Sequence, residues 1–302
     1  MRFSDPQHAI VDQLEHHGRR STRAQFEFER QLRRRLLTSD RAERAAVVAE
    51  AYGELFERFP NHGVFLANAE SRRRQGRLGA GMIAPLCERR TRVLEIGCGR
   101  GDVLAELAQQ QRICVGIEPS GRMIQMCPAG VEILPGTAEH LDFLDESFDL
   151  VFSMQVLEHM HPDDVPLHLR EALRVLRPGG CLAVETPNRR TGPQDISRGF
   201  TRTAQGLHLK EWSVTELAIQ LRRAGFVRCR GLLAPPFLAR RSALLHRWTR
   251  VPIGVKRAQD VLLGLVPGLR LRTLVGKLLG LDDIFIFGRK PAVRAAGAAP
   301  QE

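Results

Sequence analysis

The chain has 302 residues, 43% of them hydrophobic, and a formal net charge of +11. This length suits one large α/β domain with additions or two small domains. The six cysteines stand singly, which argues against a disulfide framework or a zinc site. The first residues lack the apolar core of a signal peptide, and no apolar run reaches about 18 residues. We therefore expect a cytoplasmic protein that is neither secreted nor integral to a membrane.

Residues 1–78 are predicted to form a charged helical cap, because apolar residues such as Phe26, Leu32 and Leu36 recur near helical spacing. The arginine runs 33–35 and 72–74 raise the alternative of a nucleic-acid partner. Acidic residues are interspersed with them, whereas a surface that tracks phosphates needs one sign of charge. We therefore expect solvated arginines on helix surfaces and no nucleic-acid partner.

The segment Arg92–Asp102 joins an apolar strand to a glycine-rich turn. The strand, 92–96, has the composition of a short buried parallel strand. Gly97, Gly99 and Gly101 allow the backbone to turn sharply and to approach a ligand that any Cβ would displace. This arrangement predicts a nucleoside-binding loop.

The acidic residue Asp102 indicates which kind of nucleoside ligand this loop binds. A dinucleotide fingerprint needs a third glycine where this chain has Asp102. A carboxylate there would repel a pyrophosphate from the helix N-terminus, but it would not repel a ligand that carries an amine and a sulfonium. The loop therefore favours a cationic ligand, and Glu95 is predicted to face it.

The pattern E-x-G-x-G-x-G, at Glu95, Gly97, Gly99 and Gly101, resembles the first motif of the class I S-adenosylmethionine-dependent methyltransferases. Further matches follow in order, and the resemblance covers about residues 93–188. Glu118 ends a second apolar strand about 20 residues after the first glycine, where an acid binds ribose hydroxyls in doubly wound folds.

Three later segments continue the resemblance. Gly136–Glu139 resembles the segment that frames the adenine, although the family often has Asp where this chain has Thr137. Phe148–His159 and Val175–Asn188 resemble the fourth and fifth strands with their flanking loops. The resemblance implies S-adenosyl-L-methionine as cofactor, bound by Glu95, Gly97, Cys98, Gly99, Gly101, Glu118, Pro119, Thr137, Ala138, Glu139 and Met154.

Strands are predicted near 92–96, 113–117, 131–134, 148–154, 181–186, 226–232 and 283–288, with helices between most of them. Such alternation indicates an α/β fold: a Rossmann-like, seven-stranded, mostly parallel sheet with helices on both faces. The family's last strand is antiparallel, and 284–288 is its candidate. A capping box from Ser213 to Glu216 begins a helix that Gly225 ends.

The expected organisation is the helical region at 1–78, a methyltransferase domain at 79–290 and a disordered tail at 291–302. An insertion at 233–281 precedes the last strand and holds nine lysines and arginines against one acid, Asp260. The same insertion is rich in leucine. It is therefore predicted to touch an anionic membrane through 237–279, at the inner membrane surface, or to meet an acidic lipid-like substrate.

Methyl transfer is an in-line displacement that depends on positioning. His159 and His208 are the candidate bases for a hydroxyl acceptor, since the histidine pKa lies near neutral pH. Glu158 is a candidate substrate contact. Asn188, in a Thr-Pro-Asn sequence that resembles the Thr-x-Asn of ubiquinone-pathway O-methyltransferases, either contacts the substrate or closes a tight turn. His159 and its near neighbours His161, Asp163 and Asp164 hold the atoms of a metal site, but we predict no metal.

The sequence thus predicts an S-adenosylmethionine-dependent enzyme that methylates a small-molecule or lipid-linked acceptor, on oxygen by preference. An RNA methyltransferase is one alternative, but the Asn/Asp-Pro-Pro-aromatic signature of base methylation is replaced by Ser153–Val156. A binding protein without turnover is another, and the ligand-facing Glu95 and Glu118 argue against it. The acceptor's identity and the oligomeric state stay open.

Overall fold

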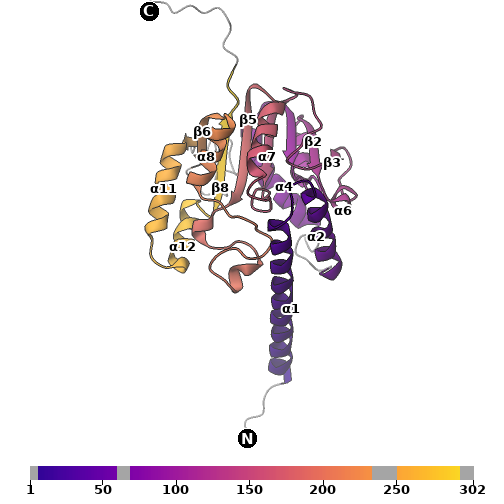
Figure 1. The fold of residues 1–302 in the computed structure, drawn as a ribbon, viewed down its shortest axis with the longest axis vertical. Coiled ribbons are helices and arrows are strands. Elements are labelled where there is room, and N and C mark those ends of the chain that lie inside the picture. The colour runs from indigo at the N-terminus through magenta and orange to yellow at the C-terminus, as the bar shows by residue number, and fades with distance from the viewer. Residues whose placement is uncertain (1–5, 60–68, 233–249, 293–302) are drawn as a thin grey trace, which may run out of the picture.

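The computed structural model describes residues 6–59, 69–232 and 250–292, and its centre is one eight-stranded sheet (Figure 1). The strand order is β3-β2-β1-β4-β5-β8-β6-β7. The first five strands are parallel, and β8 runs antiparallel to both β5 and β6. The strands are β1 (Arg92–Ile96), β2 (Ile113–Glu118), β3 (Glu132–Pro135), β4 (Phe148–Met154), β5 (Leu176–Pro187), β6 (Val227–Leu232), β7 (Arg250–Pro252) and β8 (Asp283–Arg289).

The predicted α/β class, the mostly parallel sheet and the antiparallel last strand are confirmed, but the predicted count of seven strands is wrong. The additional strand is β7, three residues long, which pairs antiparallel with β6 at the sheet edge. It lies inside the predicted insertion. A stretch of three residues has no sequence pattern that distinguishes a strand from a loop. The segment becomes a strand only because it pairs with the edge of β6.

Both faces of the sheet are buried, as the apolar runs predict. Alternate residues of β5 point into two separate cores: Leu182 and Val184 into one, Cys181 and Ala183 into the other. The first core is closed by α7 (Val165–Val175) and α8 (Val214–Ala224). The second is closed by α4 (Ala69–Ile83), the short η1 (Ala84–Leu86) and α5 (Asp102–Gln109). The capping box of α8 at Ser213 and the left-handed Gly225 at its end are confirmed.

Two N-terminal helices, α1 (Pro6–Leu37) and α2 (Arg44–Arg58), form a third apolar core with part of the loop before α8. One end of α1 projects away from the sheet, whereas its other end packs against the body (Figure 1). Phe26 stacks on Phe200 with ring centroids 4.5 Å apart. Arg33 donates a hydrogen bond to the carbonyl of Leu209 at 3.0 Å. These contacts hold α1 and α2 over the carboxyl ends of the parallel strands.

The described part of the insertion consists of β7, α11 (Ile253–Leu265) and α12 (Leu269–Leu279), while residues 233–249 lie outside the described ranges. The two helices lie at one end of the sheet, beside β6 and β8 (Figure 1). The remaining short elements are α6 (Gly121–Ile124), η2 (Arg189–Thr191) and η3 (Ile196–Gly199). Among the described helices, none has the length and apolar character needed to span a bilayer. Most of the predicted tail, from residue 293 on, is outside the described residues.

Candidate functional site

The glycine loop after β1 uses its three glycines in two different ways. All three have positive φ angles, of 68° at Gly97, 55° at Gly99 and 78° at Gly101. A Cβ on Gly97 would meet Val156 at 2.6 Å, and one on Gly101 would meet Ile133 at 2.9 Å. A Cβ on Gly99 would meet no described atom within 4 Å. Gly97 and Gly101 therefore allow close packing, whereas Gly99 leaves open space in front of the loop.

Glu118 is fixed beside this loop by two backbone amides. Its Oε2 accepts a hydrogen bond from the Gly99 N–H at 3.0 Å, and its Oε1 accepts one from the Ser120 N–H at 3.0 Å. Burial raises the pKa of Glu118, and these two hydrogen bonds oppose the rise. Because each carboxylate oxygen can accept more than one hydrogen bond, the side chain retains capacity for a pair of ligand hydroxyls.

Glu95 lies on the other side of the loop. Its side chain is buried, and Oε2 has no hydrogen-bond partner in the described part of the chain. Burial, with Asp102 and Glu118 nearby, raises the pKa of Glu95 well above its usual value. A buried carboxylate oxygen without a partner is costly. A ligand ammonium group would supply both the missing donor and the compensating charge.

The loop separates two pockets. The smaller, of about 460 Å³, is lined by Glu95, Cys98 and Met154 together with α4 residues. The larger, of about 1050 Å³, is lined on its sheet side by Glu118, Pro119 and the segment 136–139. Gly97 and Gly99 border both. Of the predicted cofactor contacts, Gly101 borders neither, because it begins α5 and packs on Ile133.

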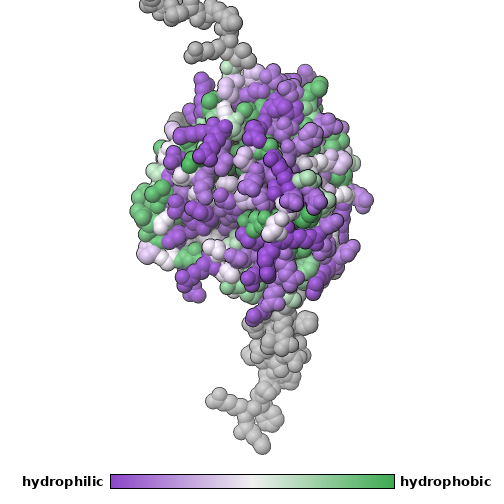
Figure 2. All heavy atoms as spheres, viewed as in Figure 1, coloured by the Kyte–Doolittle hydropathy of each residue, from purple (hydrophilic) through white to green (hydrophobic). Residues whose placement is uncertain are grey.

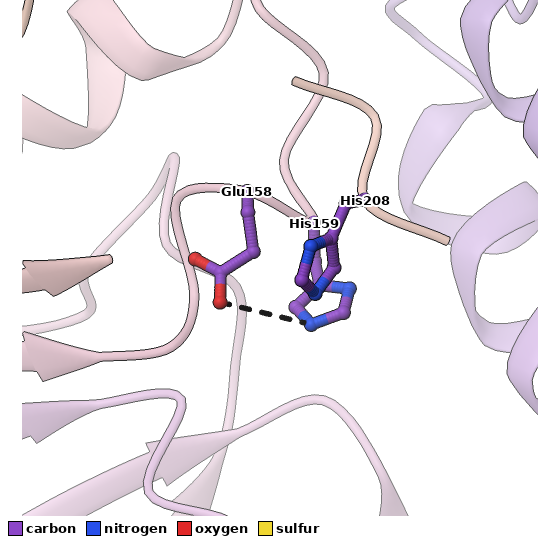
Figure 3. A group of neighbouring side chains, drawn as sticks. All are labelled: Glu158, His159 and His208. Carbon is purple, nitrogen blue, oxygen red and sulfur yellow. Dashed lines mark ion pairs between the residues drawn. The ribbon is translucent and has the colours of Figure 1, made fainter. Parts of the chain in front are cut away.

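Both predicted histidines also line the larger cavity. Figure 3 shows their rings next to each other. Their rings lie edge to face with centroids 4.8 Å apart. His159 Nδ1 lies 3.1 Å from the Leu207 carbonyl, which requires a proton on that nitrogen and leaves Nε2 as an acceptor. His208 Nδ1 lies 2.8 Å from Glu211 Oε1, and Glu211 also accepts the Gln194 N–H at 2.7 Å.

The His208–Glu211 pair has the arrangement of a general base and the carboxylate that orients it. Burial lowers the pKa of His208, but the hydrogen bond to Glu211 and the charges of Glu158, Asp195 and Glu211 outweigh it and raise the pKa overall. With Nδ1 donating to Glu211, the Nε2 atom is the one available to accept a proton. Glu211 was missed from the sequence, although its position three residues after His208 was a signal.

Glu158, predicted as a substrate contact, is not among the residues that line the larger cavity. It is fully buried behind the histidines, where Oε2 accepts the Thr186 hydroxyl at 2.9 Å and Oε1 lies 4.0 Å from His159 Nε2 (Figure 3). Burial raises the pKa of Glu158 to about 7, and the charge of His208 opposes that rise. The carboxyl group therefore acts on ligands only through the histidines.

Asn188, for which the sequence offered a substrate contact or a tight turn, forms a turn in the structure. The side chain is buried and donates to Asp260 Oδ1 at 3.0 Å and to the Leu281 carbonyl at 2.9 Å. Its Oδ1 accepts the Arg190 N–H at 3.1 Å and closes the turn at η2. The side chain thus joins α11, the segment before β8 and the η2 turn at the end of β5.

The histidine-rich sequence 159–164 does not assemble the metal site considered as an alternative. His161 Nε2 lies 3.3 Å from the Leu37 carbonyl, and Asp164 forms an ion pair with Arg44 at 2.6 Å. Glu158, His159 and His208 instead bring three donor atoms within 4.8 Å of one another. A divalent ion would fit there only after the side chains moved closer, because metal–nitrogen bonds measure about 2.0–2.1 Å.

The roof of the larger cavity comes from α2, which sequence reasoning treated only as a cap. Val48, Ala49, Tyr52 and Phe56 line it. The Tyr52 ring meets the edge of His159 at 6.4 Å between centroids. Burial raises the pKa of Tyr52, as do the charges of Glu158 and Glu118. The helical spacing of the apolar residues predicted a helix here, but it could not show which of its residues would face a cavity.

Comparisons with known proteins agree with this geometry. Residues 94–184 match a family model described as a methyltransferase domain. A probable S-adenosylmethionine-dependent methyltransferase of Mycobacterium tuberculosis is 36% identical over 148 residues, which is 48% of this chain and 52% of that protein. A ubiquinone biosynthesis O-methyltransferase of Azorhizobium caulinodans is 34% identical over 152 residues, 45% of this chain and 58% of that protein. The chain thus spans about half the length of the curated relatives it matches.

The fold also has a solved counterpart. A crystal structure of a SAM-dependent methyltransferase from Archaeoglobus fulgidus aligns with a TM-score of 0.52 at 19% identity, covering 79% of this chain and 99% of that one. That likeness concerns the fold alone. Residues 94–184 thus form a methyltransferase domain similar to that of S-adenosylmethionine-dependent methyltransferases, and the sheet has the fold of the Archaeoglobus fulgidus structure.

Proposed function

We propose that the protein transfers a methyl group from S-adenosylmethionine to a hydroxyl group of a bulky, largely apolar small molecule. The observation that carries the proposal is a single cavity that is lined both by Gly99 and Glu118 and by His159 and His208. Holding donor and acceptor in line in such a space supplies most of the catalysis of a displacement reaction.

The residues around the glycine loop fit the cofactor. Glu118 would accept hydrogen bonds from the ribose hydroxyls, and the open space before Gly99 admits the nucleoside. The unpartnered Glu95 would face the amino group of the methionine portion. Segment 137–139 would frame the adenine. When bound, the cofactor supplies the activated methyl group.

The acceptor proton would pass to His208 Nε2. Glu211 holds the ring in the tautomer that leaves this nitrogen unprotonated, and it stabilises the imidazolium that forms. His159 lies next to His208 and would contact the same acceptor. Glu211 is a positioning residue, because it reaches the acceptor only through His208.

The acceptor class follows from the remaining walls. Val48, Tyr52, Phe56, Met160 and Leu207 contribute apolar surface opposite the glycine loop. Such walls favour an aromatic or prenylated hydroxyl compound. The M. tuberculosis and A. caulinodans relatives support methylation, and the second acts in ubiquinone biosynthesis by its name. RNA fits less well, because its binding needs a continuous basic groove and this cavity is also lined by Glu29, Glu139 and Asp195.

The experiment incubates the full-length protein with S-adenosylmethionine and a panel of catechols, phenols and prenylated phenols, with mass spectrometric detection of methylated products. We expect transfer to a hydroxyl compound, and we expect His208→Asn to slow it about 10²- to 10⁴-fold while cofactor affinity stays unchanged. Glu132→Gln, an exposed change on β3, is the matched control. Calorimetry that detected no S-adenosylmethionine binding would overturn the proposal, as would transfer to nitrogen alone.

A further inference from the structure

The outer side of α11 and α12 carries an unusual amount of exposed apolar surface. Leu262, Leu265 and Leu278 are 64%, 75% and 68% exposed. Eight of the fifteen large hydrophobic residues that are exposed in the described part of the chain lie between 255 and 279. Hydrophobic residues gather over α11 at the left of the molecule (Figure 2, placed as in Figure 1). The α11–α12 face consists of Val255, Val261, Leu262, Leu265, Leu271, Leu274, Leu278 and Leu279.

The same face is cationic and lacks exposed acids. Arg270 and Lys277 are exposed. Between 253 and 279 the single acid is Asp260, which is fully buried and paired with Arg190 at 2.9 Å. Arg272 is directed back to the Val266 carbonyl at 3.1 Å. The exposed charges of residues 253–279 are therefore all positive, and they lie among the exposed leucines and valines of the α11–α12 face.

Packing within the protein does not need this face, because the opposite sides of both helices already attach them. Ile253 and Leu263 are buried on α11, and Lys256 Nζ donates to the Gly280 carbonyl at 3.1 Å. On α12, the Thr273 hydroxyl donates to the Thr191 carbonyl at 2.6 Å. Both helices are thus fixed to the body, while eight large apolar side chains are exposed in the part of the chain that the structure describes. An apolar patch of this kind marks an interaction site.

We propose that the α11–α12 face binds the surface of an anionic lipid bilayer, with its leucines among the upper acyl chains and Arg270 and Lys277 at the head groups. Charge complementarity argues for this occupant. Composition also favours a bilayer, since protein interfaces are enriched in Tyr, Trp, Phe, Met and Arg, and of these residues 253–279 contain only Arg, which a bilayer of anionic lipid attracts as well. The proposal goes beyond the methyl-transfer reaction and stands whatever the acceptor is.

The test is flotation of the full-length protein with vesicles of phosphatidylcholine alone or mixed with phosphatidylglycerol, at low and high salt. We expect binding to the mixed vesicles that high salt weakens. Leu262→Ser with Leu278→Ser should lower the partition coefficient at least tenfold, because two apolar side chains are lost from the bound face. Met126→Ser with Leu144→Ser, also exposed but distant in sequence from both helices, is the matched control and should bind normally.

The charges are tested in the same way. Arg270→Gln with Lys277→Gln should lower binding about fivefold per charge, which corresponds to about 1 kcal/mol each. Arg222→Gln with Arg223→Gln, exposed on α8, removes the same charge elsewhere and should have a much smaller effect. Circular dichroism checks that each variant is folded.

Three results would overturn the proposal. The first is no binding to phosphatidylglycerol vesicles at low salt. The second is equal loss of binding in the α11–α12 variants and their controls. The third is light scattering that shows a dimer which the leucine variant converts to a monomer while its vesicle binding is unchanged, because the face would then join two copies of this chain.

Discussion

Replacement of Glu118 by glutamine tests the cofactor assignment most directly. The carboxylate oxygens accept from the Gly99 and Ser120 amides, and each would also accept from one ribose hydroxyl. In glutamine one oxygen becomes an NH₂ donor. That group would face a backbone N–H instead of accepting from it, and it could no longer accept from the second hydroxyl.

The size of the effect follows from these hydrogen bonds. A hydrogen bond to a charged group contributes about 1.5–3 kcal/mol. The variant loses one such bond to the ligand, weakens the other by removing the charge, and loosens the loop. We therefore expect the binding free energy to fall by about 2–4 kcal/mol, which raises Kd about 30- to 1000-fold.

Isothermal titration calorimetry with S-adenosylmethionine measures this change, and circular dichroism checks that the variant is folded. Glu132→Gln removes one carboxylate from the neighbouring strand β3, where the side chain is exposed, and should leave Kd unchanged. A Kd for Glu118→Gln within threefold of the parent value, in a folded protein, would refute the assignment of Glu118 to the ribose.

Three further predictions concern the loop and the opposite wall. Gly99→Val should abolish cofactor binding in calorimetry and lower the free energy of unfolding by only about 1–2 kcal/mol, because the added Cβ enters open space at a positive φ. Gly97→Val should lower the free energy of unfolding by about 3 kcal/mol, because its Cβ meets Val156. Normal cofactor binding by Gly99→Val would contradict this prediction. Burial raises the pKa of Glu158 from 4.5 to about 7, so between these pH values the folded state binds a proton that the unfolded state has lost. The contribution of Glu158 to stability is therefore fully present below pH 4.5 and is lost as the pH rises through 7. Glu158→Gln should therefore gain about 3 kcal/mol relative to the parent between pH 4.5 and pH 8 in urea unfolding, and a difference that does not change with pH would count against the buried carboxyl. Glu211→Gln should lower the pKa of His208 by removing the hydrogen bond that raises it, which moves the acid limb of the kcat profile to lower pH; an unmoved limb would show that Glu211 does not orient the base.

The sequence by itself predicted seven of the eight strands in their chain order, and it predicted the glycine loop and the acid that the fold places beside it. The reason is that these signals are local. The apolar stretch 92–96, the glycines after it and Glu118 at the end of the next strand each depend on neighbours within a few residues, and the pairing of β1 with β2 then brings loop and acid together. The two histidines named from the sequence, His159 and His208, both line the larger cavity.

The tertiary structure alone decided which polar side chains face the cavity. Asn188 appeared to be a substrate contact, but its partner Asp260 is 72 residues away on α11. Asp164 was one of four neighbouring residues with the atoms of a metal site, but its partner is Arg44, 120 residues away on α2. A side chain's chemistry can be read from its type, whereas its direction depends on which distant element packs against it. Local spacing holds no record of such contacts, so the part of the larger cavity that α2 lines became visible only when α2 was placed on the sheet.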